Sequence, residues 1–428
     1  MSRAVIVGAV GLAVSACMGP GDTVTRAAPA QPVTALGAAR GEAAESPIID
    51  ALLSRQSALP KGGAFDTVAD AVLAANSRAA EAELRSARLR AQAAAKNWLP
   101  TIGPQVSLSS LSQVAAQLVV DQVLFGGGRK KAERAFARAD VEVAAVSLAQ
   151  DTNQRVFIAL SLYLDAQKAR EKAALAAQSE TDMARFEWVM NERVQGGISN
   201  SSDLNVLRQK LSEIRADKQA QAEAAAAALA ELNAMAIRLL GDVSGLSALQ
   251  VAAGEPEPLA VMLAEAEKLR AAEAAKIEKA GYMPQVSANA VLGDNGSGPS
   301  LTVTSDQPLG FGTGASLQAI AAQAQAADRK VGQAREDANR RLRRLEAQGS
   351  ALARQATEAT ALTQAARRNL DMFQAQYDAG QRQVMDVVGV YEAYARQQEA
   401  QVDLRYDAAR AQLEIARDLG LLADGGRI

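Results

Sequence analysis

The chain has 428 residues, a formal net charge of −2, 4% aromatic residues and abundant Ala. A near-neutral charge suggests neither a nucleic-acid partner nor an acidic surface, and few aromatics argue against large globular cores. The absence of His and the single Cys exclude His-based acid–base catalysis, Cys/His metal sites and disulfides within one chain. Stretches rich in Ala, Glu, Gln, Arg and Leu are typical of long packed helices. We expect no cofactor and no metal.

The N-terminus is organised as a secretory signal peptide. Arg3 precedes a short apolar run that cannot span a bilayer as a stable helix. Val14-Ser15-Ala16-Cys17 resembles the bacterial lipobox, whose Cys becomes the lipidated first residue of the mature protein. We therefore expect a signal peptide at 1–16 and a lipidated N-terminus with an extended linker at 17–64. Met18 in place of Asp favours the outer membrane, and an ordinary cleavage site with an incidental Cys is the alternative.

Two copies of one plan follow this linker. The predicted segments are a first repeat at 65–241, a linker at 242–257, a second repeat at 258–420 and a short C-terminal tail at 421–428. Each repeat predicts a helix ended by Pro, two short strands, a Gly-rich corner, a long helix, a Gly turn and a return helix. Pro100 and Pro284 are separated by almost the same interval as Gly197 and Gly380, which indicates duplication.

The pattern predicts one helix before the strands of each repeat and a long helical hairpin after them. The expected helices before the strands are Thr67–Trp98 and Pro258–Tyr282. The expected hairpin helices are Arg129–Gln195, Ser201–Leu240 with a C-cap at Gly241, Ala315–Ala379 and a last one that ends at Leu419. Apolar residues step by three and four along both return helices, as in a coiled-coil seam. They are Leu204, Leu207, Leu211 and Ile214 in the first, and Val387, Val390 and Tyr394 in the second.

The first outgoing helix carries two apolar seams. Val156, Ala159 and Tyr163 follow one face, while Ile158 and Leu162 lie on another. A helix with two apolar seams has neighbours on both sides, which favours a ring of helices. An ordinary antiparallel hairpin bundle is the alternative.

Four short stretches show the alternation of a half-buried strand: "QVSLSSL", "QLVVDQVLF", "QVSANAVL" and "SLTVTSD". One apolar and one polar face suit the wall of a membrane barrel, and a small soluble sheet is the alternative. Four strands cannot close a barrel, and open edges in lipid leave backbone groups unpaired at several kcal/mol each. A membrane location therefore requires several chains to associate.

This ordered set resembles the TolC family of outer-membrane efflux and secretion channels over about residues 60 to 420. The stretch "DQVLFGGGRKKAERAFARADVEVAAVSLAQ" is similar to the family's second strand and first long helix. "QYDAGQRQVMDVVGVYEAYARQQEAQ" is similar to its periplasmic turn. The resemblance implies a mainly α fold with a small β-barrel part. A long antiparallel coiled-coil α-helical barrel would join four membrane strands per chain, with two internal repeats, in a homotrimer.

The resemblance also implies function. It predicts a lipid-anchored channel-tunnel in the outer membrane of a Gram-negative bacterium, extending into the periplasm. The channel would export small molecules or proteins with a periplasmic adaptor protein and a proton-driven or ATP-driven inner-membrane transporter, without chemistry of its own. A lipid-anchored periplasmic coiled-coil scaffold without a pore is the alternative, but strands between the helices favour the channel. "GFGTGAS" lacks the Lys of a phosphate loop and is interpreted as a strand-to-helix corner.

The interruptions of the two hairpins correspond to the family's periplasmic tip. Tyr377, Arg382 and Asp386 match the Tyr, Arg and Asp of its gate, and Asp203 matches the acidic partner of that Arg. A bridge from Arg382 to Asp203 would hold the tip closed, whereas charges that only solvate a helix tip are the alternative. Gly389 stands where the gate can carry a second Asp, so a doubled acidic ring is not implied. The turns are assigned to glycines whose backbone permits a tight reversal: Gly196, Gly197 and Gly380.

Overall fold

The computed structural model describes residues 34–40, 46–75, 79–110, 113–249, 256–293 and 298–428, which belong to one unit, Thr34–Ile428. The predicted signal peptide and Cys17 lie outside the described residues.

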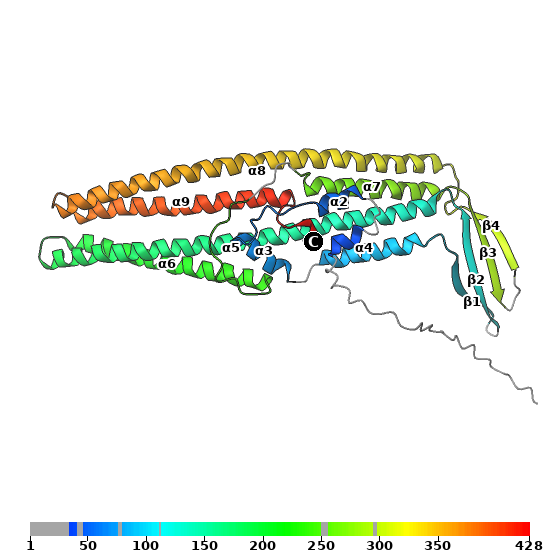
Figure 1. The fold of residues 1–428 in the computed structure, drawn as a ribbon, viewed down its shortest axis with the longest axis horizontal. Coiled ribbons are helices and arrows are strands. Elements are labelled where there is room, and N and C mark those ends of the chain that lie inside the picture. The colour runs from blue at the N-terminus through cyan, green and yellow to red at the C-terminus, as the bar shows by residue number, and fades with distance from the viewer. Residues whose placement is uncertain (1–33, 41–45, 76–78, 111–112, 250–255, 294–297) are drawn as a thin grey trace, which may run out of the picture. The chain divides into compact units, whose positions relative to one another are not determined.

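The long elements occur twice in the same order (Figure 1). The first set is α4 (Ala79–Ala95), β1 (Thr101–Ser110), β2 (Gln113–Phe125), α5 (Arg129–Gln195) and α6 (Ser201–Met235). The second set is α7 (Leu259–Ala280), β3 (Gln285–Gly293), β4 (Gly298–Thr304), α8 (Thr313–Asp378) and α9 (Val384–Asp418). The shorter elements are α1 (Ala35–Arg40), α2 (Pro47–Leu53), α3 (Ala64–Leu73) and the 3-10 helix η1 (Gly425–Arg427). The duplication itself stays a prediction.

The predicted long helices are found within two residues of their expected ends, with two differences. The helix expected over Thr67–Trp98 is divided into α3 and α4. Helix α8 continues through Gly332 and Gly349, although a Gly in a helix interior costs about 1 kcal/mol relative to Ala. A methyl group in place of the Gly349 hydrogen would lie 3.8 Å from the Ala411 side chain of α9, so the two helices approach closely there.

The second difference concerns the end of α6, which stops at Met235 instead of continuing to Leu240. Beyond it the backbone leaves the helix axis, and the Asn233 side chain accepts from the Leu240 amide at 2.9 Å. The segment then lies along α5, where the Tyr163 hydroxyl donates to the Gly245 carbonyl at 2.7 Å. Gln167 donates in the same way to the Val243 carbonyl at 3.0 Å. Tyr163 and Gln167 thus donate hydrogen bonds to carbonyl groups of this segment, which a straight continuation of α6 would not place beside them.

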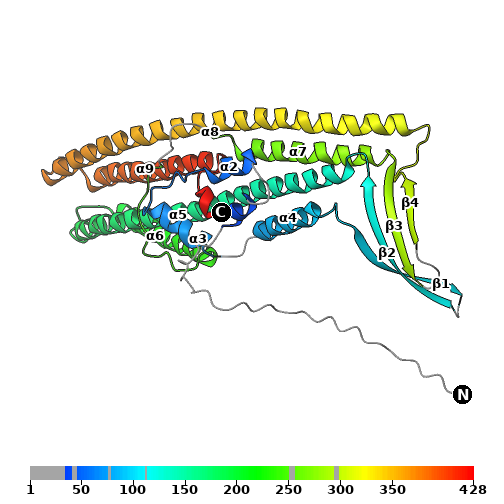
Figure 2. The ribbon, with the colours of Figure 1, turned by 45° about the vertical axis from the view of Figure 1, so that its right-hand side comes forward.

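Helices α5 and α6 form one antiparallel hairpin and α8 and α9 form another, and α5 contacts α9 along the seam between them. At about 1.5 Å per residue, α5 and α8 are each roughly 100 Å long. The two hairpin turns lie at one end of these helices, and the sheet lies at the other (Figures 1 and 2). The distance between sheet and turns is therefore set by the uninterrupted helices.

Halfway along the hairpins, short segments from both ends of the described chain meet. The Leu36 amide donates to the carbonyl of the last residue, Ile428, at 3.1 Å, and the Ala58 amide donates to the Leu421 carbonyl at 2.8 Å. Arg55, only 9% exposed, donates to the Leu419 carbonyl and, at 2.6 Å, to the Glu257 carbonyl. Burial lowers the pKa of Arg55 to about 10, partly opposed by the charge of Glu257. One guanidinium thus ties three segments together.

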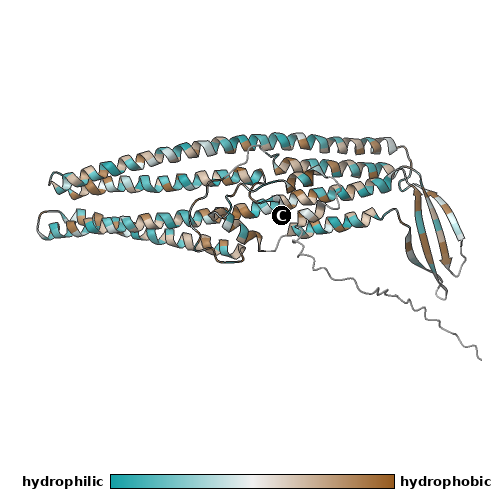
Figure 3. Cartoon of the chain, viewed as in Figure 1, coloured by the Kyte–Doolittle hydropathy of each residue, from teal (hydrophilic) through white to brown (hydrophobic). Residues whose placement is uncertain are grey.

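The four strands form one antiparallel sheet in the order β1-β2-β3-β4. Its register places most apolar residues of the four strands on one face, where Ile102 lies opposite Val120 and Val286 opposite Val303. Val119 and Val291 are paired on the other face. Five large side chains of this face are 42–71% exposed: Ile102, Leu118, Leu292, Leu301 and Val303. The sheet is visibly richer in hydrophobic residues than most of the helices (Figure 3). The alternation predicted from the sequence is confirmed.

The other face of the sheet is mainly polar and makes its own hydrogen bonds. The Gln117 side chain donates to the Gln105 side chain at 2.8 Å, and the Asn289 amide donates to the Thr302 hydroxyl at 2.5 Å. Among the described residues, no helix is long and apolar enough to cross a membrane.

Candidate functional site

The two hairpin turns at the tip have the same backbone structure. Gly197 and Gly380 adopt left-handed conformations, with φ of 73° and 76°. The Gly197 amide donates to the Val194 carbonyl at 3.0 Å, and the Ile198 amide donates to the Arg193 carbonyl at 2.8 Å. This is the Schellman motif, which ends a helix at a residue in the left-handed conformation.

The second turn repeats these bonds. The Gly380 amide donates to the Tyr377 carbonyl at 2.8 Å, and the Gln381 amide donates to the Gln376 carbonyl at 2.9 Å. Gly197 and Gly380 therefore sit at turn positions that favour glycine. Gly196 is the C-cap of α5 with φ of −77°, which any residue adopts, so its identity is not required by the backbone.

Below the turns, the two hairpins share one apolar core, the tip core. It is built from residues of all four long helices: Met183, Phe186, Met190, Leu204, Leu207, Leu211, Leu370, Val384, Val387, Val388 and Tyr391. Three of the four predicted seam residues of α6 are buried in it, and Ile214 is partly buried. In α9 the buried stripe is Val384, Val387 and Tyr391, so the predicted stripe through Val390 and Tyr394 lies at the edge of the core. Movement of one hairpin tip relative to the other must disturb this core.

Tyr391 carries a polar link through the tip core. Its hydroxyl donates to the Asp182 carboxylate of α5 at 2.9 Å and lies 3.3 Å from the Ser179 hydroxyl. Its ring contacts Phe186 edge-on with centroids 6.1 Å apart. Burial, with the charge of Asp182, raises the pKa of Tyr391, so the hydroxyl stays neutral. No sequence pattern indicates the role of Tyr391, because its partners lie on a helix distant in sequence.

The gate residues predicted from the sequence are brought to the same end of the unit, but they are not all in contact. Arg382 donates to the Gln376 side chain at 3.0 Å, and its guanidinium lies 4.6 Å from the Phe373 ring centre. Within the described chain it forms no ion pair with Asp203. Tyr377 is half-buried against the tip core.

The two acidic gate residues lie in the first turns of the return helices. Asp386 completes a capping box with Gln383, because its carboxylate accepts from the Gln383 amide at 3.2 Å. Asp203 lies in the first turn of α6, behind the N-cap residue Asn200. Among the described residues, Asp203 has no hydrogen bond or ion pair.

Ion pairs join the hairpins above the tip core, along the seam of α5 and α9. Asp165 pairs with Arg410, Glu171 pairs with Arg405, and Lys172 pairs with Asp403 at 2.8 Å. Most of these groups are partly exposed, and exposed pairs contribute only about 0–1 kcal/mol each. These weak pairs flank a second buried apolar cluster, to which α5 contributes Leu160 and Leu164 and α9 contributes Val402 and Leu413.

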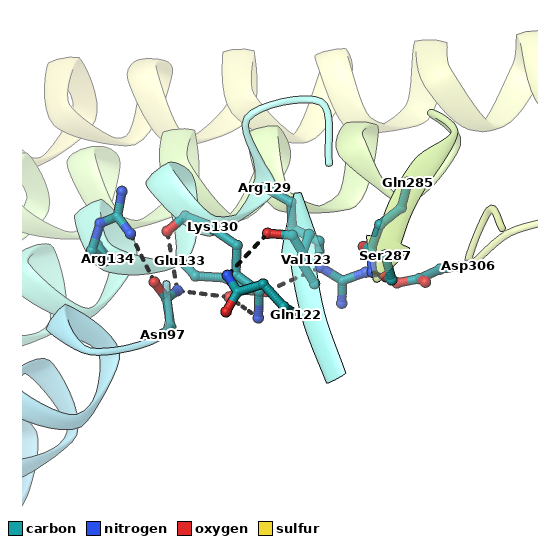
Figure 4. Close-up of polar contacts among 10 residues, drawn as sticks. All are labelled: Asn97, Gln122, Val123, Arg129, Lys130, Glu133, Arg134, Gln285, Ser287 and Asp306. Carbon is teal, nitrogen blue, oxygen red and sulfur yellow. Dashed lines mark hydrogen bonds and ion pairs between the residues drawn. The ribbon is translucent and has the colours of Figure 1, made fainter. Parts of the chain in front are cut away.

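A polar cluster joins the sheet to the helices at the other end of the unit (Figure 4). Arg129, the first residue of α5, pairs with Glu133 at 3.0 Å and with Asp306, which follows β4. The Asn97 side chain donates to Glu133 at 2.9 Å and accepts from Arg134 at 2.8 Å. The cluster links segments from both predicted repeats, so it fixes the corner where the strands meet the helices.

Several solved structures share this fold. A membrane protein from Pseudomonas aeruginosa is 16% identical, with a TM-score of 0.71 over 86% of this chain and 92% of that one. The open state of the MtrE outer membrane channel from Neisseria gonorrhoeae is 15% identical, with a TM-score of 0.70 over 87% and 93%. The outer membrane protein VceC from Vibrio cholerae is 16% identical, with a TM-score of 0.67 over 83% and 96%.

No protein-family model matches the sequence, and no curated protein matches it either. At these identities the likeness is one of fold, and it extends over most of each chain. The mainly helical fold with a small antiparallel sheet, predicted from the sequence, is confirmed. The chain thus has the fold of outer-membrane channels, as its resemblance to the TolC family predicts.

Proposed function

We propose that the protein is a channel-tunnel through which small molecules or proteins cross the periplasm and the outer membrane. The sheet carries this proposal. Its one face is mainly apolar and exposed, its opposite face is mainly polar, and it lies at the end of helices roughly 100 Å long. An apolar outer face with a polar inner face is the arrangement of a strand wall around an aqueous channel in lipid.

The open edges of the sheet make association part of the proposal. Strands β1 and β4 each pair on one side only. In lipid, unpaired backbone groups cost several kcal/mol each, so β1 of one copy would pair with β4 of the next. Three copies, as the family resemblance implies, would close a twelve-strand wall. The long helices also expose apolar side chains that neighbouring copies would cover, among them Ile158, Val206, Leu362 and Met372.

A pair of substitutions on adjacent residues of β4 tests the orientation of the sheet. Leu301 lies on the apolar face and Thr302 on the polar face. Leu301→Lys places a charge in lipid, at a cost of about 2–4 kcal/mol near the midplane. We expect it to lower the fraction of protein that resists alkaline extraction from membranes, whereas Thr302→Lys keeps that fraction. Equal retention of both variants would favour the scaffold without a pore.

For the tip we propose a latch between neighbouring copies, in which Arg382 of one chain pairs with Asp203 of the next. Its support is that Arg382 is exposed beside the turn and that Asp203 has no polar partner among the described residues of its own chain. Arg382→Ala or Asp203→Ala should each raise the conductance of reconstituted protein. Arg343→Ala, an exposed Arg far from the turn, is the control. Unchanged conductance in both latch variants would rule the latch out.

The proposed setting follows the same reasoning. The chain would be held in the outer membrane of a Gram-negative bacterium by its strands and by a lipid on Cys17, and its tip would meet a periplasmic adaptor and an inner-membrane transporter. Cys17→Ser should give a chain without acyl groups in intact-mass measurements. A variant that still carries them would contradict the lipid anchor.

A further inference from the structure

The two corners at which strands pass into long helices differ in backbone and in charge. Gly128, before α5, has φ of 84°, whereas Gly312, before α8, has φ of −83°. The first corner, "FGGGRKKAER", places Arg129, Lys130 and Lys131 in the first turn of α5. In the second corner, no residue from Leu309 to Ala327 carries a charge. Positive charges at the start of a helix oppose its dipole, so helix stability does not account for the first corner.

Two of the first corner's cations are used inside the structure. Arg129 pairs with Glu133 and Asp306, and Arg134 donates to Asn97. The remaining cations, Lys130 and Lys131, form what we call the basic corner. Lys130 has one contact, to Glu133 at 3.4 Å, which Arg129 shares, whereas Lys131 forms no ion pair with any described residue. The basic corner therefore presents positive charge that is only weakly compensated.

Large apolar side chains are exposed at the same level of the molecule. Trp98 is 62% exposed, Phe125 is 60% exposed and Phe311 is fully exposed. Contacts tie Trp98 to the basic corner, because the adjacent Asn97 donates to the Lys130 carbonyl at 3.1 Å. The Trp98 carbonyl also accepts from the Gln122 side chain of β2 at 2.8 Å, which fixes the position of Trp98 along the sheet. Exposed aromatics at the end of an apolar strand face are typical of a membrane–water interface.

We propose that the basic corner binds the headgroups of anionic phospholipids on the periplasmic side of the membrane. The proposal rests on the proposed function, because it requires the sheet to lie in lipid. Aromatic side chains would sit at the headgroup level, and the neighbouring lysines would meet the phosphates of lipids with net negative charge. Since the second corner lacks charge, each chain would bind such lipids at one side only, giving a repeating pattern around an oligomer.

Trp98 makes the proposal directly measurable. The chain has two Trp residues, and the other, Trp188, lies in α5 toward the tip. Full-length protein with Trp188→Phe is reconstituted into vesicles that contain brominated phosphatidylcholine or brominated phosphatidylglycerol, and bromine quenching of Trp98 emission is recorded. We expect stronger quenching by phosphatidylglycerol. Each Lys near an anionic surface strengthens binding roughly fivefold. The preference for phosphatidylglycerol over phosphatidylcholine should therefore be at most about thirtyfold for two lysines, and it should weaken as salt is added.

Two variants in the same background decide the result. Lys130→Ala with Lys131→Ala should abolish the preference and keep quenching by phosphatidylcholine. Arg343→Ala with Arg344→Ala removes the same charge from an exposed part of α8 and should keep the preference. Equal quenching by the two lipids, or a preference that survives loss of both lysines, overturns the basic corner while the channel stands. If no brominated lipid quenches Trp98, the membrane location of the sheet fails as well.

Discussion

Replacing Tyr391 by Phe should loosen the hairpin tips without unfolding the chain. The change removes the hydroxyl that donates to Asp182 at 2.9 Å and keeps the ring against Phe186. A hydrogen bond to a charged group contributes about 1.5–3 kcal/mol, and each 1.4 kcal/mol changes an equilibrium tenfold. Local opening of the tip should therefore become about tenfold to a hundredfold more frequent in each chain.

Hydrogen exchange followed by mass spectrometry measures this opening directly. Peptides from the tip halves of α5 and α9 should exchange faster in Tyr391→Phe, while peptides from α4 and α7 keep their rates. Tyr391→Ala also removes the ring, and the loss of its packing costs about 3–5 kcal/mol of stability. This variant should expose the whole tip core. Tyr282→Phe, at the opposite end of the unit, is the matched control. Unchanged exchange at the tip of Tyr391→Phe would refute the idea that this hydroxyl joins the hairpins.

Three further predictions concern stability, read from denaturant midpoints of the purified protein. Gly380→Ala should destabilise the folded chain by about 1–2 kcal/mol because φ of this residue is 76°. Gly389→Ala lies inside α9, where an added methyl group has free space, and should stabilise the folded chain by up to about 1 kcal/mol. Shifts of the same sign in the two variants would contradict the assigned turn. Arg55→Ala should cost roughly 2–5 kcal/mol because two carbonyls lose their donor, and an unchanged midpoint would contradict its linking role. Burial raises the pKa of Tyr163 and Tyr406 from 10.0 to about 12, so the folded chain keeps protons that the unfolded chain releases. The stabilisation that these two protonated tyrosines give the folded chain is complete below pH 10 and should be lost as the pH rises through about 12. The loss should be smaller in Tyr163→Phe, and a loss as large as in the unchanged protein would refute the role of Tyr163.

The sequence allowed the long elements to be predicted because their signals are local. Helix α5 was predicted residue for residue, since no Gly or Pro interrupts it and glycines mark both its ends. Strand alternation likewise predicted the apolar face. Contacts between distant segments could not be predicted in this way. The partners of Arg55, Asp182 and Asp306 lie on other elements, and no residue pattern along the chain indicates them.

At the tip, too, local features could be predicted from the sequence and contacts between distant residues could not. Glycine signals located both turns, but the contacts of Arg382 depend on how side chains pack around the second turn. In one chain this guanidinium lies on Phe373 and Gln376. The proposed partner is Asp203 of the next copy, so a sequence match alone cannot decide whether the two residues meet. The latch therefore stays a prediction.

The most direct test of the channel is the conductance of the purified, full-length protein in planar bilayers, with its mass in detergent measured on the same sample. Three chains that close one strand wall should give a mass three times that of the chain and discrete conductance steps. These steps should become larger in Arg382→Ala. A monomer that inserts without conductance, or a protein that does not insert, would contradict the channel-tunnel.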